Sequence, residues 1–204
     1  MLDYDAEAPR YDETRGGEAR ARAAADAIER MLPAATRGVL DVACGTGIVT
    51  ARLVRPGRTV YGTDRSHGML AVAARRLPGR VVRGDATALP FRAGSLDAVV
   101  MIWLLHLLPE TGPAIAEAAR VLRPGGVLVT TVDKNAGVPG RSASDRFDIV
   151  AGQAQRHGLT PAGETRFTGI GQGHGGPDPV YRLAALRSAA MMPATPVIPL
   201  GNGW

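Results

Sequence analysis

The stretch Gly38-Val39-Leu40-Asp41-Val42-Ala43-Cys44-Gly45-Thr46-Gly47 decides the predicted fold of this chain. Its first half is apolar and β-branched, which is typical of a buried parallel strand. Gly45 and Gly47 then allow a tight turn with no Cβ in the way of a ligand. Residues 48–54 predict the opening of a helix. A strand, a glycine turn and a helix N-terminus together indicate a nucleotide-type site, where free backbone N–H groups face the ligand.

The residues around this turn narrow the choice of ligand. A dinucleotide fingerprint needs glycine or alanine three residues after the second glycine, and that position is Thr50. Asp41 would repel a pyrophosphate and attract a cation. D-V-A-C-G-T-G resembles the first motif of class I S-adenosylmethionine-dependent methyltransferases, whose pattern is acid-x-G-x-G-x-G. Ala43 stands where the first glycine usually lies. The resemblance implies an aminoacyl nucleoside ligand with an ammonium, a sulfonium and no phosphate.

A second acid follows at the end of the next predicted strand, residues 59–63. Asp64 lies about twenty residues beyond the glycine turn, where this type of fold places a carboxylate against a ribose. The segment G-T-D-R-S-H-G-M-L resembles the family pattern G-x-D-x-S-x-x-M-L. The resemblance implies that Asp64 accepts hydrogen bonds from both ribose hydroxyls, with Arg65 and Met69 also contacting the cofactor.

The third acid of the series is Asp85. It begins the segment D-A-T-A-L-P-F, which resembles the family's D-A-x-x-L-P-F after a short predicted strand. The resemblance implies that Asp85 and the backbone of Ala86 bind adenine, and that Met69 supplies part of an apolar wall for the ring. Taken alone, Asp85 would be an ordinary turn residue. Its position after Asp41 and Asp64 in an ordered series supports the interpretation.

Trp103 and His106 follow a central strand predicted over residues 95–102. Ligands of open α/β sheets bind beyond the carboxyl ends of the strands, so both residues should border the site. His106 is the candidate general base, because an imidazole exchanges protons near neutral pH. The alternative, that His106 packs over the cofactor or holds its loop, stays open at this point.

The N-terminal segment, residues 1–17, is predicted to be a mobile lid. Its string Y-D-E-T-R-G-G resembles a stretch that precedes the core in many of these methyltransferases, which implies that Tyr11 and Arg15 contact the cofactor. A frayed terminus is the alternative. The expected organisation is a single domain over residues 1–190, with a cofactor-binding core at 18–132 and a substrate-side part at 133–190. Residues 191–204 are expected to form an extended or disordered tail.

The predicted fold is α/β: a Rossmann-like, seven-stranded, mostly parallel sheet with helices on both faces. Two late strands, at 165–171 and 180–186, are expected to form an antiparallel hairpin at the C-terminal edge of this sheet. Helices are expected at 18–32, 110–122 and 143–157. A chain of 204 residues suits one such domain.

The composition and the net charge help to predict the cellular compartment of the protein and its binding partners. The net charge is +5 with a pI of about 10.1, but the arginines are scattered, which favours a solvated basic surface over a nucleic-acid site. The single cysteine cannot form an internal disulfide, and no metal-ligand spacing is present, so no metal is expected. The first residues lack the features of a signal peptide, and a cytoplasmic protein is expected.

These patterns predict an S-adenosylmethionine-dependent methyltransferase acting in small-molecule biosynthesis. The methyl group would pass to an oxygen or nitrogen, less readily a carbon, of a metabolite or natural product by direct displacement, releasing S-adenosylhomocysteine. Two alternatives stay open: an S-adenosylmethionine-binding enzyme of non-methylating type (cyclisation or rearrangement), and a basic nucleic-acid-binding protein without enzymatic activity. The sequence leaves the substrate, the acceptor atom and a homodimer undecided.

Overall fold

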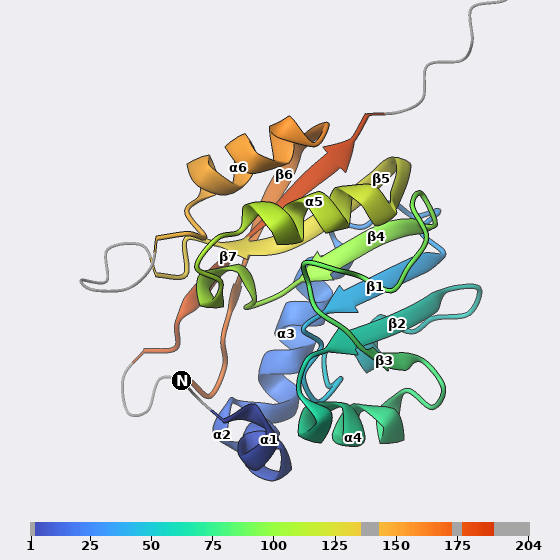
Figure 1. Cartoon of the computed structure of the whole chain (residues 1–204). Helices are drawn as coiled ribbons and strands as arrows, with labels where there is room; N and C mark the ends of the chain where they lie inside the picture. Colours follow the sequence, from blue (N-terminus) through green and yellow to red (C-terminus); the bar gives the residue numbers. More distant parts are fainter. Residues whose placement is uncertain (1–2, 136–142, 173–176, 190–204) are drawn as a thin grey trace, which may run out of the picture.

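The computed structural model describes residues 3–135, 143–172 and 177–189, so the tail expected at 191–204 lies outside the described residues. The described chain forms one sheet surrounded by helices (Figure 1). The strands are β1 Gly38–Val42, β2 Thr59–Asp64, β3 Val81–Arg83, β4 Leu96–Met101, β5 Leu122–Val132, β6 Leu159–Thr168 and β7 Val180–Ser188. The helices are α1 Tyr4–Glu7, α2 Tyr11–Thr14, α3 Gly17–Glu29, α4 His67–Arg76, α5 Gly112–Val121 and α6 Phe147–Arg156, with 3-10 turns η1 Ala8–Arg10, η2 Thr50–Leu53 and η3 Leu105–Leu107.

The sheet has seven strands in the order β3-β2-β1-β4-β5-β7-β6. Strands β1 to β5 pair in parallel, whereas β7 is antiparallel to both β5 and β6. The predicted α/β fold with its antiparallel C-terminal hairpin is therefore confirmed. Because β1 to β5 are parallel, their carboxyl ends lie at one edge of the sheet, where the residues after each strand can meet.

Helices cover both faces of the sheet (Figure 1). Buried residues of α5 and α6 pack with one face of the strands in a first core cluster. Alanines and Ile28 of α3 pack with the opposite face in a second cluster, together with Leu53 of η2. The alanine-rich face of α3 lets this helix lie close to the strands, and its N-terminal end reaches the edge that carries the predicted site.

Two expected elements differ from the structure. The helix expected over residues 48–54 is reduced to the 3-10 turn η2. Three β-branched residues, Ile48, Val49 and Thr50, weaken helix formation here, and Pro56 follows closely. The strand expected over 165–171 instead begins at Leu159 and ends at Thr168, paired along its length with β7.

The N-terminal segment is helical and packs against the core. Asp5 accepts a hydrogen bond from the backbone N–H of Gly68 at the start of α4 (2.8 Å). Asp12 accepts one from the Thr46 hydroxyl (2.6 Å) and another from Arg76 (2.7 Å). These contacts attach residues 4–14 to the glycine turn and to α4. The mobility of this segment stays a prediction.

None of the helices in the described ranges combines the length and the apolar character needed to cross a membrane.

Gly62 provides a test of the packing between β2 and the glycine turn. A Cβ at this position would lie 2.8 Å from the Cys44 Sγ, which is too close. We expect Gly62→Ala to lower the free energy of unfolding by about 1–3 kcal/mol, because the two segments would have to move apart. Urea unfolding followed by circular dichroism measures this change.

The matched control is Gly152→Ala in α6, where a Cβ meets no heavy atom within 4 Å. This variant should be neutral or more stable by up to ~1 kcal/mol, since alanine favours a helix interior. Equal stabilities of the two variants would contradict the packing described for Gly62.

Candidate functional site

The turn after β1 has an unusual backbone. Ala43, Gly45 and Gly47 all have positive φ, at 60°, 56° and 74°. Between them, the Cys44 N–H donates to the carbonyl oxygen of Thr63 in β2 (3.0 Å). The left-handed conformation at Ala43 explains why glycine is usual at this position of the resembling motif, because a Cβ is costly there. The turn is thus held across the ends of β1 and β2.

Asp64 is the anchor of this turn. Its carboxylate accepts hydrogen bonds from the Gly45 N–H (2.8 Å) and from the Ser66 N–H (2.9 Å), one at each oxygen. A carboxylate oxygen has a second lone pair, so both oxygens can still accept hydroxyl donors. A Cβ built on Gly45 would meet only the Met69 Sδ, at 4.0 Å. The open space beside Gly45 and the partly exposed Asp64 fit a ribose with two hydroxyls.

Asp41 occupies a different environment. Its side chain is buried and accepts a 2.5 Å hydrogen bond from the Thr50 hydroxyl of η2. Burial raises the pKa of Asp41 to about 7, although the bond from Thr50 favours the ionised form, and the nearby charge of Asp64 raises the pKa further. Asp41 therefore connects β1 to η2 beneath the turn. Its predicted contribution to cofactor binding stays a prediction.

The third acid lies next to the second. Asp85 follows β3, which pairs with the end of β2. Its carboxylate accepts bonds from the backbone N–H and the hydroxyl of Thr87 (2.8 and 2.7 Å), which lower its pKa. Arg65 Nε lies 3.5 Å from the same carboxylate, and Ala86 is buried beside it. The structure thus places the residues predicted for ribose and adenine on neighbouring strand ends.

Trp103 turns away from these acids. It has φ of 57°, and its N–H donates to the Thr131 hydroxyl of β5 (2.8 Å). Its ring packs edge-on against Phe167 of β6 and Tyr181 of β7, with centroids 5.8 and 5.4 Å apart. The guanidinium of Arg20 lies over the Trp103 ring at 3.5 Å. An aromatic cluster with one arginine therefore borders the edge on the hairpin side.

His106, on η3, has a partner that the sequence analysis did not consider. Lys134 Nζ, just after β5, lies 2.7 Å from His106 Nε2. Lys134 is the only lysine in the sequence. The Nε2 nitrogen is therefore engaged with the Lys134 amine. A general-base role for His106 stays a prediction.

Tyr11 and Arg15 meet above the aromatic cluster. The Arg15 guanidinium lies 5.6 Å from the centre of the Tyr11 ring, and the Arg15 carbonyl oxygen accepts a 2.7 Å bond from Arg20. Tyr4 packs on Tyr11 with ring centres 6.2 Å apart. Burial raises the pKa of Tyr4, and the charge of Asp64 contributes to this shift. The N-terminal segment thus extends from the neighbourhood of Asp64 to Arg20.

Three residues of this edge were missed from the sequence: Tyr4, Arg20 and Lys134. The burial of Arg20 could have been predicted from the sequence, because Arg20 lies four residues before Ala24 and so falls on the apolar side of the predicted helix. Lys134 could have been noticed as the single lysine among 24 basic residues. No cluster of three or more His, Cys, Asp or Glu side chains that could hold a metal is found within the described residues.

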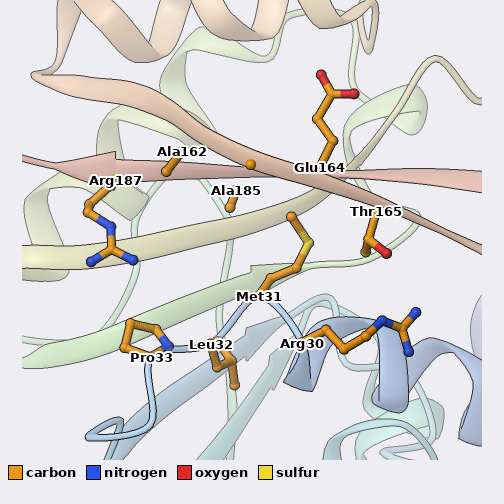
Figure 2. A pocket seen from close by; sticks show the side chains of 10 residues that line it. Arg30, Met31, Leu32, Pro33, Ala162, Glu164, Thr165, Ala185 and Arg187 are labelled. Carbon is orange, nitrogen blue, oxygen red and sulfur yellow. The ribbon is translucent and has the colours of Figure 1, made fainter.

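A surface hollow of about 460 Å³ lies elsewhere, between the C-terminal end of α3 and the β6–β7 hairpin. Figure 2 shows Met31 pointing from the end of α3 toward this hairpin. The predicted acids and His106 are absent from its lining, so it is separate from the edge described above. The hollow is lined by Arg30, Met31, Leu32, Pro33, Ala162, Gly163, Glu164, Thr165, Ala185 and Arg187.

Comparison with known proteins agrees with this arrangement. Residues 40–130 match the model of the methyltransferase domain family. The chain is 41% identical over 133 residues to a demethylmenaquinone methyltransferase of Renibacterium salmoninarum, an alignment that covers 62% of this chain and 55% of that relative. The chain therefore spans about half the length of the curated relative that it matches.

Solved structures share the fold. The [4+2]-cyclase SpnF superposes with a TM-score of 0.73 at 22% identity, over 92% of this chain and 94% of that one. The geranyl diphosphate C-methyltransferase from Streptomyces coelicolor A3(2), solved with S-adenosyl-L-homocysteine, gives a TM-score of 0.65 at 18% identity, over 82% and 76%. At these identities the likeness shows the fold alone.

The sheet order, the glycine turn and the series of acids resemble those of class I S-adenosylmethionine-dependent methyltransferases. The family match over residues 40–130 and the named relative support the same class. The resemblance to this family that the sequence predicted is thereby confirmed over residues 40–130.

The buried Asp41 predicts a pH effect on stability. Its folded pKa of about 7 lies above the ordinary value of 3.8 for an aspartate, so the folded state binds more protons between these pH values. The free energy of unfolding therefore falls as pH rises from about 4 to about 7 through this group. Asp41→Asn should lack this loss, so its stability relative to wild type should rise by a few kcal/mol over this range, at ~1.4 kcal/mol per pKa unit.

Urea unfolding of the ligand-free wild type and the variant at pH 5 and pH 8 measures this difference. Asn keeps an acceptor for the Thr50 hydroxyl, so the comparison isolates the charge. A stability difference that is the same at both pH values would contradict the burial of an ionisable Asp41.

Proposed function

We propose that this protein binds S-adenosylmethionine at the carboxyl edge of its sheet and transfers the methyl group to a small molecule. The observation that carries the proposal is the attachment of Asp64 to the glycine turn through the Gly45 N–H (2.8 Å). This bond places a carboxylate and an open backbone turn side by side. A ribose needs a carboxylate that accepts its hydroxyl groups, and the amino-acid chain attached to it needs an open backbone turn. A phosphate does not need a carboxylate.

The remaining residues follow the order of the strands. Asp64 receives the ribose hydroxyls, and Asp85 with the backbone of Ala86 receives adenine, with Met69 and Arg65 beside them. The turn of Ala43, Gly45 and Gly47 holds the amino-acid end, with the acid Asp41 beneath it. The segment with Tyr11 and Arg15 covers the site. This assignment extends the family resemblance to the positions found in the structure.

When bound, the cofactor supplies a methyl group on an activated sulfonium. Orientation then provides much of the rate, since the displacement needs a nucleophile aligned with the methyl carbon. Trp103 and His106 follow β4 and face this end of the edge. His106 Nε2 lies 2.7 Å from Lys134 Nζ, so it could take a proton from a hydroxyl acceptor only after this hydrogen bond breaks.

The relative named as a demethylmenaquinone methyltransferase supports a small-molecule substrate. We assign the protein to the cytoplasm and expect no nucleic-acid partner. The acceptor atom is an oxygen or a nitrogen in this proposal, and a carbon is the second choice.

A second candidate is a non-methylating reaction on the same scaffold. It is kept because SpnF, described as a [4+2]-cyclase, shares this fold over 92% of the chain. The two reactions differ in one product. Methyl transfer forms one S-adenosylhomocysteine for each turnover, whereas cyclisation or rearrangement forms none.

Isothermal titration calorimetry with S-adenosylmethionine tests the cofactor site. We expect one-to-one binding by the wild type and at least ~10-fold weaker binding by Asp64→Ala, because two charge-assisted hydrogen bonds are lost. Asp148→Ala is the control, since Asp148 lies on α6 and pairs only with the nearby Arg146 among the described residues. Absence of binding by folded wild-type protein, or equal binding by both variants, would contradict the proposal.

A further inference from the structure

Three N–H donors at the hairpin side of the edge are buried without a hydrogen-bond acceptor among the described residues. They are Arg15 Nε, Arg20 Nε and Trp103 Nε1. Arg20 lies over the Trp103 ring at 3.5 Å and donates to the backbone carbonyl oxygen of Arg15 at 2.7 Å, and the charge of Arg15 acts on Arg20. Buried donors are nearly always paired in native structures, so three unpaired donors in one place indicate a missing acceptor.

The charge of this group points to an anion. Arg20 is only 7% exposed, and neither Arg20 nor Arg15 forms an ion pair with a described residue. The charged or titratable groups that act on Arg20 are Tyr11, Tyr181 and Arg15, with no carboxylate among them. A buried cation beside a second cation is costly unless an anion joins them. The aspartates described at this edge do not fill this role, because Asp64 and Asp85 lie at the ends of β2 and β3 and Asp133, after β5, pairs with Arg182.

The position separates Arg20 and Trp103 from the residues proposed to bind ribose and adenine, whereas Arg15 belongs to the segment proposed to cover the cofactor. Along the sheet order, the adenine and ribose acids lie after β3 and β2 and the glycine turn lies after β1. Trp103 follows β4, and its ring contacts Phe167 and Tyr181 on the β6–β7 hairpin. Arg20 therefore lies beyond the glycine turn, on the side where a methyl acceptor would approach.

We propose that Arg20, with Arg15 and the Trp103 indole N–H, binds an anionic oxygen of the methyl-accepting substrate. The substrate class is an aromatic or otherwise apolar compound with a carboxylate or an ionised hydroxyl. Two arginines and an indole N–H supply donors for such a group, and the rings of Trp103 and Tyr181 supply an apolar wall. This inference rests on the proposed function, since it assigns the substrate side of the same site.

Tyr11, on the N-terminal segment, is one of the groups that act on the charge of Arg20. Arg20 is a specificity-determining residue in this account.

Trp103 fluorescence provides the test. The second tryptophan, Trp204, is replaced in a Trp204→Phe background, so that the signal reports on Trp103 alone. Protein saturated with S-adenosylhomocysteine is titrated with benzoate and, separately, with the uncharged benzyl alcohol. Arg20→Met removes the charge and keeps an apolar stem. Arg20→Lys keeps the charge, and Arg22→Met, exposed on the same helix, is the matched control.

We expect saturable binding of benzoate, at least tenfold tighter than benzyl alcohol. Arg20→Met should abolish this preference, Arg20→Lys should retain part of it, and Arg22→Met should leave it unchanged. S-adenosylhomocysteine affinity should be the same in all four proteins. No response to benzoate in the parent protein, or equal loss of both probes in Arg20→Met, would overturn the proposal.

Weaker S-adenosylhomocysteine binding in Arg20→Met, with benzoate binding unchanged, would also overturn it, because the anion would then be the carboxylate of the cofactor. The benzoate titration is repeated without S-adenosylhomocysteine. Failure of the parent protein to bind S-adenosylhomocysteine would contradict the proposed function, whereas the repeated titration tests the anion site by itself.

Discussion

The hydrogen bond from the Gly45 N–H to the Asp64 carboxylate is the constraint on which the rest of the site depends. It connects the turn after β1 to the end of β2, next to the bond between the Cys44 N–H and the Thr63 carbonyl oxygen. A left-handed backbone at Ala43 and Gly45 makes both bonds geometrically accessible. Loss of this geometry would separate the carboxylate from the open turn that it borders.

Other elements of the edge are arranged around this connection. The N-terminal segment reaches the same turn through Asp12, which pairs with Thr46 and Arg76. Asp41 lies beneath the turn and joins it to η2 through Thr50. The edge therefore has a polar half near β1 to β3 and an aromatic, cationic half near β4 and the hairpin. The polar half suits the ribose and adenine of the cofactor, and the aromatic, cationic half suits the substrate.

Much of this was predictable from the sequence, because motifs with local spacing carry it. The sheet, its hairpin and the positions of Asp64 and Asp85 after β2 and β3 agree with expectation. The hydrogen bond from Thr50 to the buried Asp41 did not follow from the motif, since it depends on how η2 packs against β1. The pairing of Lys134 with His106 joins residues 28 positions apart. Such contacts depend on how strand ends meet, and no local pattern records them.

A crystal structure with S-adenosylhomocysteine tests the central claim most directly. The account predicts both ribose hydroxyls within hydrogen-bonding distance of the Asp64 carboxylate, adenine beside Asp85 and Ala86, and the sulfur on the side of Trp103. The bond between Gly45 and Asp64 should persist in that complex. A ligand bound away from the carboxyl edge, or a ribose that does not contact Asp64, would contradict the account.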